Sequence, residues 1–209
     1  MRRRLKQSPN ADVYEFKREC LAEFEKLSEQ GQIDLFYGDE SGVSLLPCVP
    51  YAWQFKDEKV CMPSERGGNV NCFGLISRDN RIHRYLTEET INAAFVSERL
   101  DALSLSLSQL TVVVLDNASV HKKAVKERGA IWQERGLFVF FLPPYSPHLN
   151  IAEILWRKLK YEWLCPEDYA DKETLRYAVW QALSSVGQSL KINFQPFRDA
   201  KNADTNGLT

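Results

Sequence analysis

Residues 111–121 read TVVVLDNASVH, and this stretch decides the fold class. The unbroken, β-branched run at residues 111–115 is typical of a strand buried on both faces of a sheet that helices cover. A second such run, LFVFFL at residues 137–142, stops at two prolines that cannot continue a central strand. Between the two runs we expect a helix over residues 120–135, closed by Gly136. This alternation of strand and helix predicts an α/β fold.

Three further strands are expected before this stretch. Residues 33–37, IDLFY, run into a Gly-containing turn at Asp39. Residues 69–86, NVNCFGLISRDNRIHRYL, hold two apolar segments around Asp79 and Asn80, which predicts an antiparallel hairpin. Helices are also expected over residues 10–30 and 88–103, from residue 151 and around residues 175–183. Residues 45–66 hold three prolines and are expected to form loops, with room for at most a short additional strand around residues 51–55. This order predicts a mixed five-stranded sheet with helices on both faces.

Three acidic residues stand in distinctive local contexts: Asp39 in FYGDESG, Asp116 in VVVLDNASVH, and Glu153 in LPPYSPHLNIAEILW. We expect Asp39 and Asp116 at the C-terminal ends of adjacent strands, at the edge where open α/β sheets keep their sites. Glu153 opens an amphipathic helix that could face them. Because three clustered carboxylates repel one another, such a cluster predicts bound Mg²⁺ or Mn²⁺.

Each acid taken singly also has a structural interpretation. Asp39 could be a turn residue, and Asp116 could end a strand or cap a helix. If Asn150 is an N-cap, Glu153 is the third helical residue and completes a pattern close to a capping box. Glu153 also precedes Arg157 by four residues, a pairing worth only about 0.2–0.5 kcal/mol. The combination of the three acids favours a metal site.

Composition restricts the function less than these motifs do. The chain has 209 residues, enough for one large domain, and its net charge of -1 neither supports nor excludes DNA binding. No segment has the pattern of a secretory signal or a membrane span. Local basic clusters, each also explicable as a solvated face, comprise Arg2, Arg3, Arg4 and Lys6; Lys122, Lys123, Lys126 and Arg128; and Arg157, Lys158 and Lys160.

The cysteines indicate a reducing compartment. The chain has 5 of them, scattered without a CxxC pair, in a chain large enough to fold without disulfides. Reduced thiols in a cytosolic protein are therefore expected. A zinc site built from Cys61, Cys72 and a histidine would need a ligand spacing that the chain does not have.

The sequences GDES, LDNASVH and LPPYSPHLNIAEILW resemble the three signature blocks of the mariner-superfamily transposases, especially bacterial insertion-sequence members with a DDE endonuclease domain. The likeness extends through GNVNCFGLIS to the terminal INF, over residues 33–194. It implies a ribonuclease H-like fold in which Asp39, Asp116 and Glu153 hold two divalent ions. One ion would activate water or a DNA 3′-hydroxyl, and the other would stabilise the leaving oxygen.

The resemblance also implies roles for neighbouring residues. Asn117 and His121 would orient the metal ligands or contact DNA, and Asn150 and Arg157 are further candidates for the same roles. His148 stands where the family commonly has an acidic residue. This departure removes none of the three carboxylates.

We expect a basic N-terminus and linker helix at residues 1–31, the DDE endonuclease domain at residues 32–196, and a polar, disordered tail at residues 197–209. The family carries a helix-turn-helix region that recognises the transposon ends, whereas this chain begins at the linker helix. The sequence therefore predicts a transposase catalytic domain that cleaves and joins double-stranded DNA in the bacterial cytoplasm, at the nucleoid when it is bound to DNA. It would act as a homodimer or with a DNA-binding subunit or full-length transposase. A non-catalytic regulator that pairs with full-length transposase, and a nuclease acting on RNA–DNA hybrids, are the alternatives.

Overall fold

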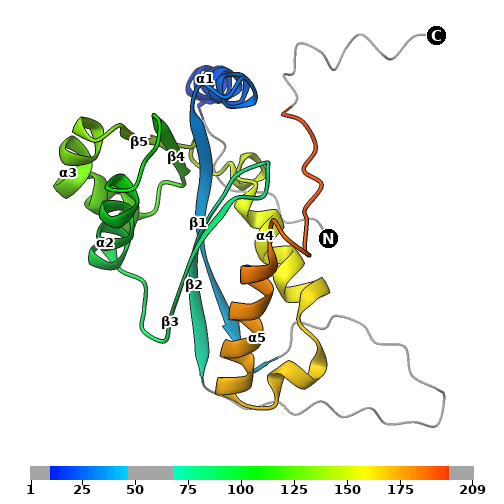
Figure 1. Ribbon diagram of the computed structural model, residues 1–209. Helices are drawn as coiled ribbons and strands as arrows, with labels where there is room; N and C mark the ends of the chain where they lie inside the picture. Colours follow the sequence, from blue (N-terminus) through cyan, green and yellow to red (C-terminus); the bar gives the residue numbers. More distant parts are fainter. Residues whose placement is uncertain (1–9, 47–67, 198–209) are drawn as a thin grey trace, which may run out of the picture. The chain divides into compact units, whose positions relative to one another are not determined.

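The computed structural model describes residues 10–46 and 68–197 (Figure 1). Several expectations lie outside these ranges: the basic cluster at residues 2–6, the strand around residues 51–55, Cys48, Cys61, and all but the first residue of the tail. None of the described helices combines the length and apolar character needed to cross a bilayer.

Five strands form one mixed sheet, as the sequence predicts, in the order β3-β2-β1-β4-β5. The strands are β1 (Asp34–Ser44), β2 (Asn69–Ile76), β3 (Ile82–Thr87), β4 (Thr111–Leu115) and β5 (Leu137–Phe141). β1, β4 and β5 run parallel, and β2 and β3 form the expected antiparallel hairpin. The register of the central pair runs from Asp34 opposite Thr111 to Tyr37 opposite Val114.

The chain divides into two compact units. The first comprises Met1–Gly38, Asn92–Ile151 and Asn193–Thr209, and the second comprises Asp39–Ile91 and Ala152–Ile192. The boundary falls inside β1, between Gly38 and Asp39.

In the first unit, three helices begin and end close to the expected positions. They are α1 (Ala11–Glu29), α2 (Ala93–Ser104) and α3 (Ser119–Glu134). The side chain of Asn10 caps α1, and Gly136, with a φ of 87°, follows α3. α2 begins at Ala93 and not at Glu88, because the side chain of Asn92 accepts a hydrogen bond from the Phe95 amide and caps the helix there. α2 packs on α3, and α3 packs on β5.

The two β-branched runs differ in burial. All residues of β4 are buried, as expected for a strand with neighbours on both sides. In β5 only Leu137 is buried, and Phe138 is 38% exposed. The prediction that β5 is buried on both faces is therefore wrong, because β5 is the edge strand of the sheet.

In the second unit, helices cover one face of the hairpin. They are α4 (Ala152–Lys158), which continues into a π-helical turn (Leu159–Trp163), and α5 (Lys172–Ser185). Gly74 of β2 faces Trp156 of α4, and its cross-strand partner Arg84 donates from Nε to Ser184 Oγ of α5 at 3.0 Å. Because directly paired residues point to the same side of a sheet, α4 and α5 share one face of the hairpin.

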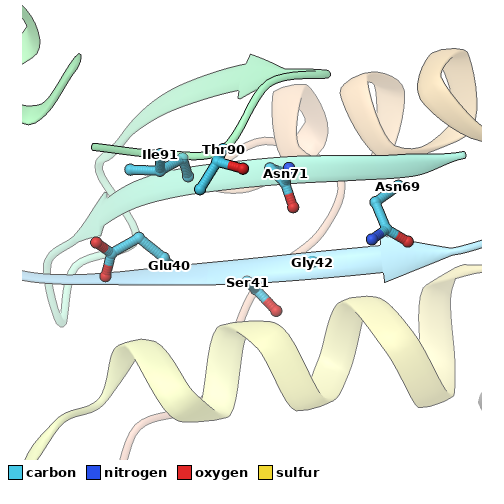
Figure 2. A pocket seen from close by; sticks show the side chains of 7 residues that line it. All are labelled: Glu40, Ser41, Gly42, Asn69, Asn71, Thr90 and Ile91. Atoms are coloured by element: carbon cyan, nitrogen blue, oxygen red, sulfur yellow. The ribbon is translucent and has the colours of Figure 1, made fainter.

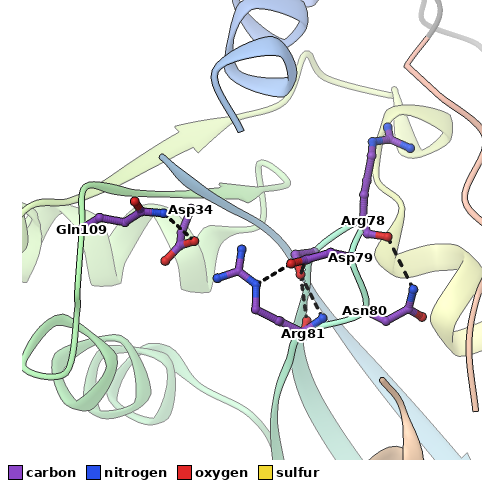
Figure 3. A network of polar contacts seen from close by, with 7 residues as sticks. Asp34, Arg78, Asp79, Asn80, Arg81 and Gln109 are labelled. Atoms are coloured by element: carbon purple, nitrogen blue, oxygen red, sulfur yellow. Dashed lines mark hydrogen bonds and ion pairs between the residues drawn. The ribbon is translucent and has the colours of Figure 1, made fainter. Parts of the chain in front are cut away.

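The hairpin turn is the one predicted from Asp79 and Asn80 (Figure 3). Asn80 has a φ of 66°, and Arg81 Nε donates to Asp79 Oδ2 at 2.7 Å. The side-chain amide of Asn80 also donates from Nδ2 to Ile192 O at 3.1 Å, and its Oδ1 accepts from the backbone N–H of Ile192 at 2.7 Å. The turn therefore fastens the end of the second unit to the hairpin. Figure 3 also shows the first-unit hydrogen bond from Gln109 to Asp34, where β1 begins.

Replacing Gly74 by alanine should destabilise the protein by about 1–3 kcal/mol, because a Cβ at this position would lie 2.8 Å from Trp156 Cη2. The measurement is the free energy of unfolding in urea. In the matched double variant, Trp156→Phe removes the clashing indole atoms, so the added cost of Gly74→Ala should shrink. An unchanged unfolding free energy in Gly74→Ala would contradict this packing.

Cys72 should resist alkylation in the folded protein. Burial raises the pKa of its thiol to about 12, so about one thiol in ten thousand is ionised at pH 8. Cys165 is exposed and serves as the internal control. Iodoacetamide labelling followed by peptide mass spectrometry should modify Cys165 first and Cys72 only in denaturant, and equal labelling rates in the native state would overturn the prediction.

Candidate active site

Asp116 directly follows β4, as the sequence predicts, and its side chain is 53% exposed. Its Oδ1 accepts hydrogen bonds from the Ala118 amide at 2.9 Å and from Nδ1 of the buried His121 at 2.8 Å. These bonds form a turn that leads into α3. Because an ionised carboxylate only accepts, we assign the proton to Nδ1 of His121.

The same contacts keep Asp116 ionised. The hydrogen bond from His121, the Ala118 amide and the charge of Lys122 lower the pKa of Asp116, against the opposing effect of partial burial. Both hydrogen bonds use Oδ1, so within the described residues Oδ2 remains available to a ligand. An ionised carboxylate with one oxygen available fits a divalent cation.

The side chain of Asn117 makes a hydrogen bond within the protein. Its Nδ2 donates to the carbonyl of Leu142, the residue after β5. The Leu142 amide in turn donates to Leu115 O at 2.9 Å. These bonds join the segment around Asp116 to the end of β5. The expected role of Asn117 toward metal or DNA stays a prediction.

Asp39 lies inside β1, so the prediction that it ends the strand in a turn is wrong. Ser41 and Gly42, which resemble turn residues in the sequence, continue the strand to Ser44. A Cβ at Gly42 would lie 3.3 Å from Asn71 Oδ1 of β2. The glycine therefore allows the close approach of a neighbouring side chain. Asp39 is half-buried.

The strand register relates Asp39 to Asp116. The last pair along the parallel strands β1 and β4 is Tyr37 opposite Val114. Asp39 and Asp116 each stand two residues further along their own segment. The expectation that both acids follow adjacent parallel strands is thus half confirmed: the strands are adjacent, but β1 continues past its acid.

Glu153 is exposed and is the second residue of α4, not the third. Because α4 begins at Ala152, Glu153 is one position earlier in the helix than the capping-box interpretation assumed, and that interpretation stays a prediction. Asn150 is buried, 5% exposed, and its Nδ2 donates to Gly38 O at 3.0 Å. Arg157 is exposed, and in the described part of the chain no ion pair joins it to Glu153.

The three carboxylates belong to different units: Asp116 to the first, and Asp39 and Glu153 to the second. Within residues 10–46 and 68–197, no three acidic, histidine or cysteine side chains form a ready group for a metal ion. The chemistry of the donors nevertheless fits Mg²⁺ or Mn²⁺, which prefer carboxylate oxygens. The expected metal site therefore stays a prediction.

The basic cluster of α3 is largely exposed. Lys122, Lys123 and Lys126 face solvent. Arg128 instead pairs with Asp101, with Nη2 at 2.8 Å from Oδ2. Three of the four basic residues therefore remain open to a polyanion.

A polar cavity of about 310 Å³ in the second unit was not expected from the sequence (Figure 2). Its lining residues are Glu40, Ser41, Gly42, Asn69, Asn71, Thr90 and Ile91. The sequence feature that could have indicated this cavity is the pair of alternating asparagines, Asn69 and Asn71, in the otherwise apolar strand β2. In Figure 2 the Ser41 side chain points toward the neighbouring helix and Glu40 to the other side. Because strand side chains alternate, Asp39 shares the side of Ser41, away from Glu40.

Sequence reasoning also missed Tyr14 and Lys17 of α1. The hydroxyl of Tyr14 lies 2.9 Å from His148 Nε2, and Lys17 Nζ donates to Phe141 O at 2.6 Å. These partners lie more than a hundred residues apart in the chain, and no local pattern connects them.

Comparison with known proteins agrees with this architecture. The family model described as DDE superfamily endonuclease matches residues 34–176. An insertion element IS630 uncharacterized 39 kDa protein from Shigella sonnei is 26% identical over 173 residues, which are 80% of this chain and 47% of that protein. The chain thus spans about half the length of this relative.

Solved structures show the same fold. The catalytic domain of Mos1 mariner transposase aligns with 87% of this chain and 93% of its own, at 15% identity and a TM-score of 0.50. The Mos1 mariner paired end complex with Mn aligns with 88% of this chain and 63% of its own, at 17% identity and a TM-score of 0.53.

These matches confirm the expected ribonuclease H-like fold and the resemblance to insertion-sequence transposases, and they give no support to a non-catalytic regulator. The family model covers well over half of the chain, including Asp39, Asp116 and Glu153. This chain belongs to the DDE superfamily endonucleases.

Proposed function

We propose that this chain is the catalytic domain of a DDE transposase, which cleaves and joins DNA phosphodiester bonds with Asp39, Asp116 and Glu153 as ligands of two divalent ions. The observation that carries the proposal is the setting of Asp116. It follows a buried strand parallel to β1, and hydrogen bonds hold it ionised with one oxygen available. The region that matches the DDE endonuclease family, residues 34–176, contains all three residues.

Mg²⁺ or Mn²⁺ is the proposed cofactor, since the Mos1 complex that this chain resembles is described with Mn. Bound ions would supply Lewis acidity for the attacking and leaving oxygens of an in-line displacement. The chain's own residues would perform the remaining tasks. The three carboxylates would hold the ions, and His121 would fix the orientation of Asp116 through Oδ1.

Double-stranded DNA is the proposed substrate. Lys122, Lys123 and Lys126 are exposed on the helix that begins after Asp116, and lysines of this kind attract phosphates. The Mos1 complex is described as a paired end complex, so we propose that this chain also handles two DNA ends, as a dimer or with a DNA-binding subunit. The bacterial cytoplasm is the proposed location, in line with the insertion-element relative.

Nicking of supercoiled plasmid DNA in the presence of Mn²⁺ or Mg²⁺ tests this function. Asp39→Asn, Asp116→Asn and Glu153→Gln should each reduce the rate about a hundredfold or more, because each removes a metal ligand. Glu173→Gln is the matched control, since Glu173 is likewise exposed and is the second residue of α5. It should cleave like the wild type.

Two results would count against the proposal. One is cleavage that persists in EDTA, and the other is an Asp116→Asn rate equal to the wild-type rate. An RNA–DNA hybrid of the same sequence should be cleaved more slowly than duplex DNA. A preference for the hybrid would point to the alternative nuclease.

A further inference from the structure

We infer that helix α1 positions the segments that carry the three acids, with Lys17 and Tyr14 as the positioning residues. This inference rests on the proposed function. All of its contacts lie within the first unit.

The C-terminal half of α1 is anchored independently of these two residues. Leu21 is fully buried, and Phe24 packs edge-on against Phe140 with ring centroids 5.2 Å apart. The hydroxyl of the buried Tyr37 donates to the buried carboxylate of Glu25. Tyr37 stands two residues before Asp39, so α1 already touches the segment of the first acid.

Lys17 connects α1 to the segment of the second acid. Its Nζ donates to Phe141 O at 2.6 Å and lies 3.5 Å from Leu142 O. Leu142 O also accepts the hydrogen bond from Asn117, the residue after Asp116. One carbonyl at the end of β5 thus lies within reach of the Lys17 ammonium and binds the amide beside Asp116.

The position of Lys17 has an energetic cost, which indicates that its ammonium has a specific role. Partial burial and the charge of Lys122 lower the pKa of Lys17, which means that the ammonium loses solvation in this position. A lysine that served only to solubilise the helix would extend into water, as the exposed Lys26 does. Fixing the end of β5 is a role that accounts for a charge in this partly buried position.

Tyr14 connects α1 to the segment of the third acid. Its hydroxyl lies 2.9 Å from Nε2 of His148, in the 3-10 turn Pro147–Leu149. The turn is followed by Asn150, which binds Gly38 O, and then by α4 with Glu153. Together, the contacts of α1 reach Tyr37, the Leu142–Asn117 pair and His148, one in each acid-bearing segment.

Steady-state nicking kinetics on the full chain test the inference. Lys17→Met and Tyr14→Phe should each lower kcat about tenfold or more and leave the KM for DNA unchanged, because losses in residues that orient metal ligands cost roughly 10–100-fold. Lys17→Arg keeps a cationic donor and should recover most of the activity. Lys26→Met, on the same helix, should behave like the wild type.

A rise in KM with unchanged kcat would overturn the inference and make Lys17 a DNA contact. Wild-type kcat in both Lys17→Met and Tyr14→Phe would overturn it as well. Should Lys17→Met fail to fold, Tyr14→Phe decides alone, because the Tyr14–His148 contact is at the surface.

Hydrogen exchange separates failure of this inference from failure of the proposed function, since it needs no cleavage. The Ala118 amide, which donates to Asp116 Oδ1, should exchange faster in Lys17→Met than in the wild type or in Lys26→Met, as measured by NMR. Unchanged exchange at Ala118 contradicts the inference even in an active enzyme. Faster exchange in a protein that cleaves nothing supports the inference and contradicts the proposed function.

Discussion

The parallel pairing of β1 with β4 is the constraint on which the rest of this structure depends. β4 has 5 residues and β1 has 11, so β1 continues where β4 has ended. The same register therefore gives the two acids different supports. Asp116 is held by a turn and by His121, whereas Asp39 is held by the strand backbone itself. The side chain of Asp39 is therefore set by the extended backbone of its strand, and that of Asp116 by two local hydrogen bonds.

The sequence predicted the regular elements well because their signals are local. The β-branched run of β4, the turn residues Asp79 and Asn80, and Gly136 after α3 each act within a few residues. The errors come from residues whose environment is set elsewhere in the chain. Gly42 is a residue type typical of turns, but here it lies in a strand, where the absence of a Cβ makes room for the neighbouring side chain of Asn71. The exposure of β5 could not be inferred from its residues, because an apolar run is compatible with a central strand and with an edge strand of a sheet.

In the candidate site too, features set by nearby residues were predictable and features set by distant residues were not. Asp116 and its turn were predictable, since the acid directly follows the strand that the run defines. The role of Asn150 was not predictable, because its partner Gly38 is 112 residues away and a helix cap was the local alternative. The contacts of Tyr14 and Lys17 are more distant still, and neither residue type indicates a partner. Residue patterns therefore identify the acids and the nearby His121, but not the supporting residues that come from distant parts of the chain.

The supporting contacts have a common chemistry. Asn150 donates from its side chain to Gly38 O inside β1, one residue beyond the last residue paired with β4. Asn117, Asn80 and Lys17 donate from their side chains to main-chain carbonyls at or just after the end of a strand, or in an irregular segment. Carbonyls at such places have lost the regular ladder, and buried ones require a donor from elsewhere. The family match covers residues 34–176, so the Lys17 side of this network lies outside it. The Lys17 contact thus joins a helix outside the matched region to carbonyls inside it, at the end of β5.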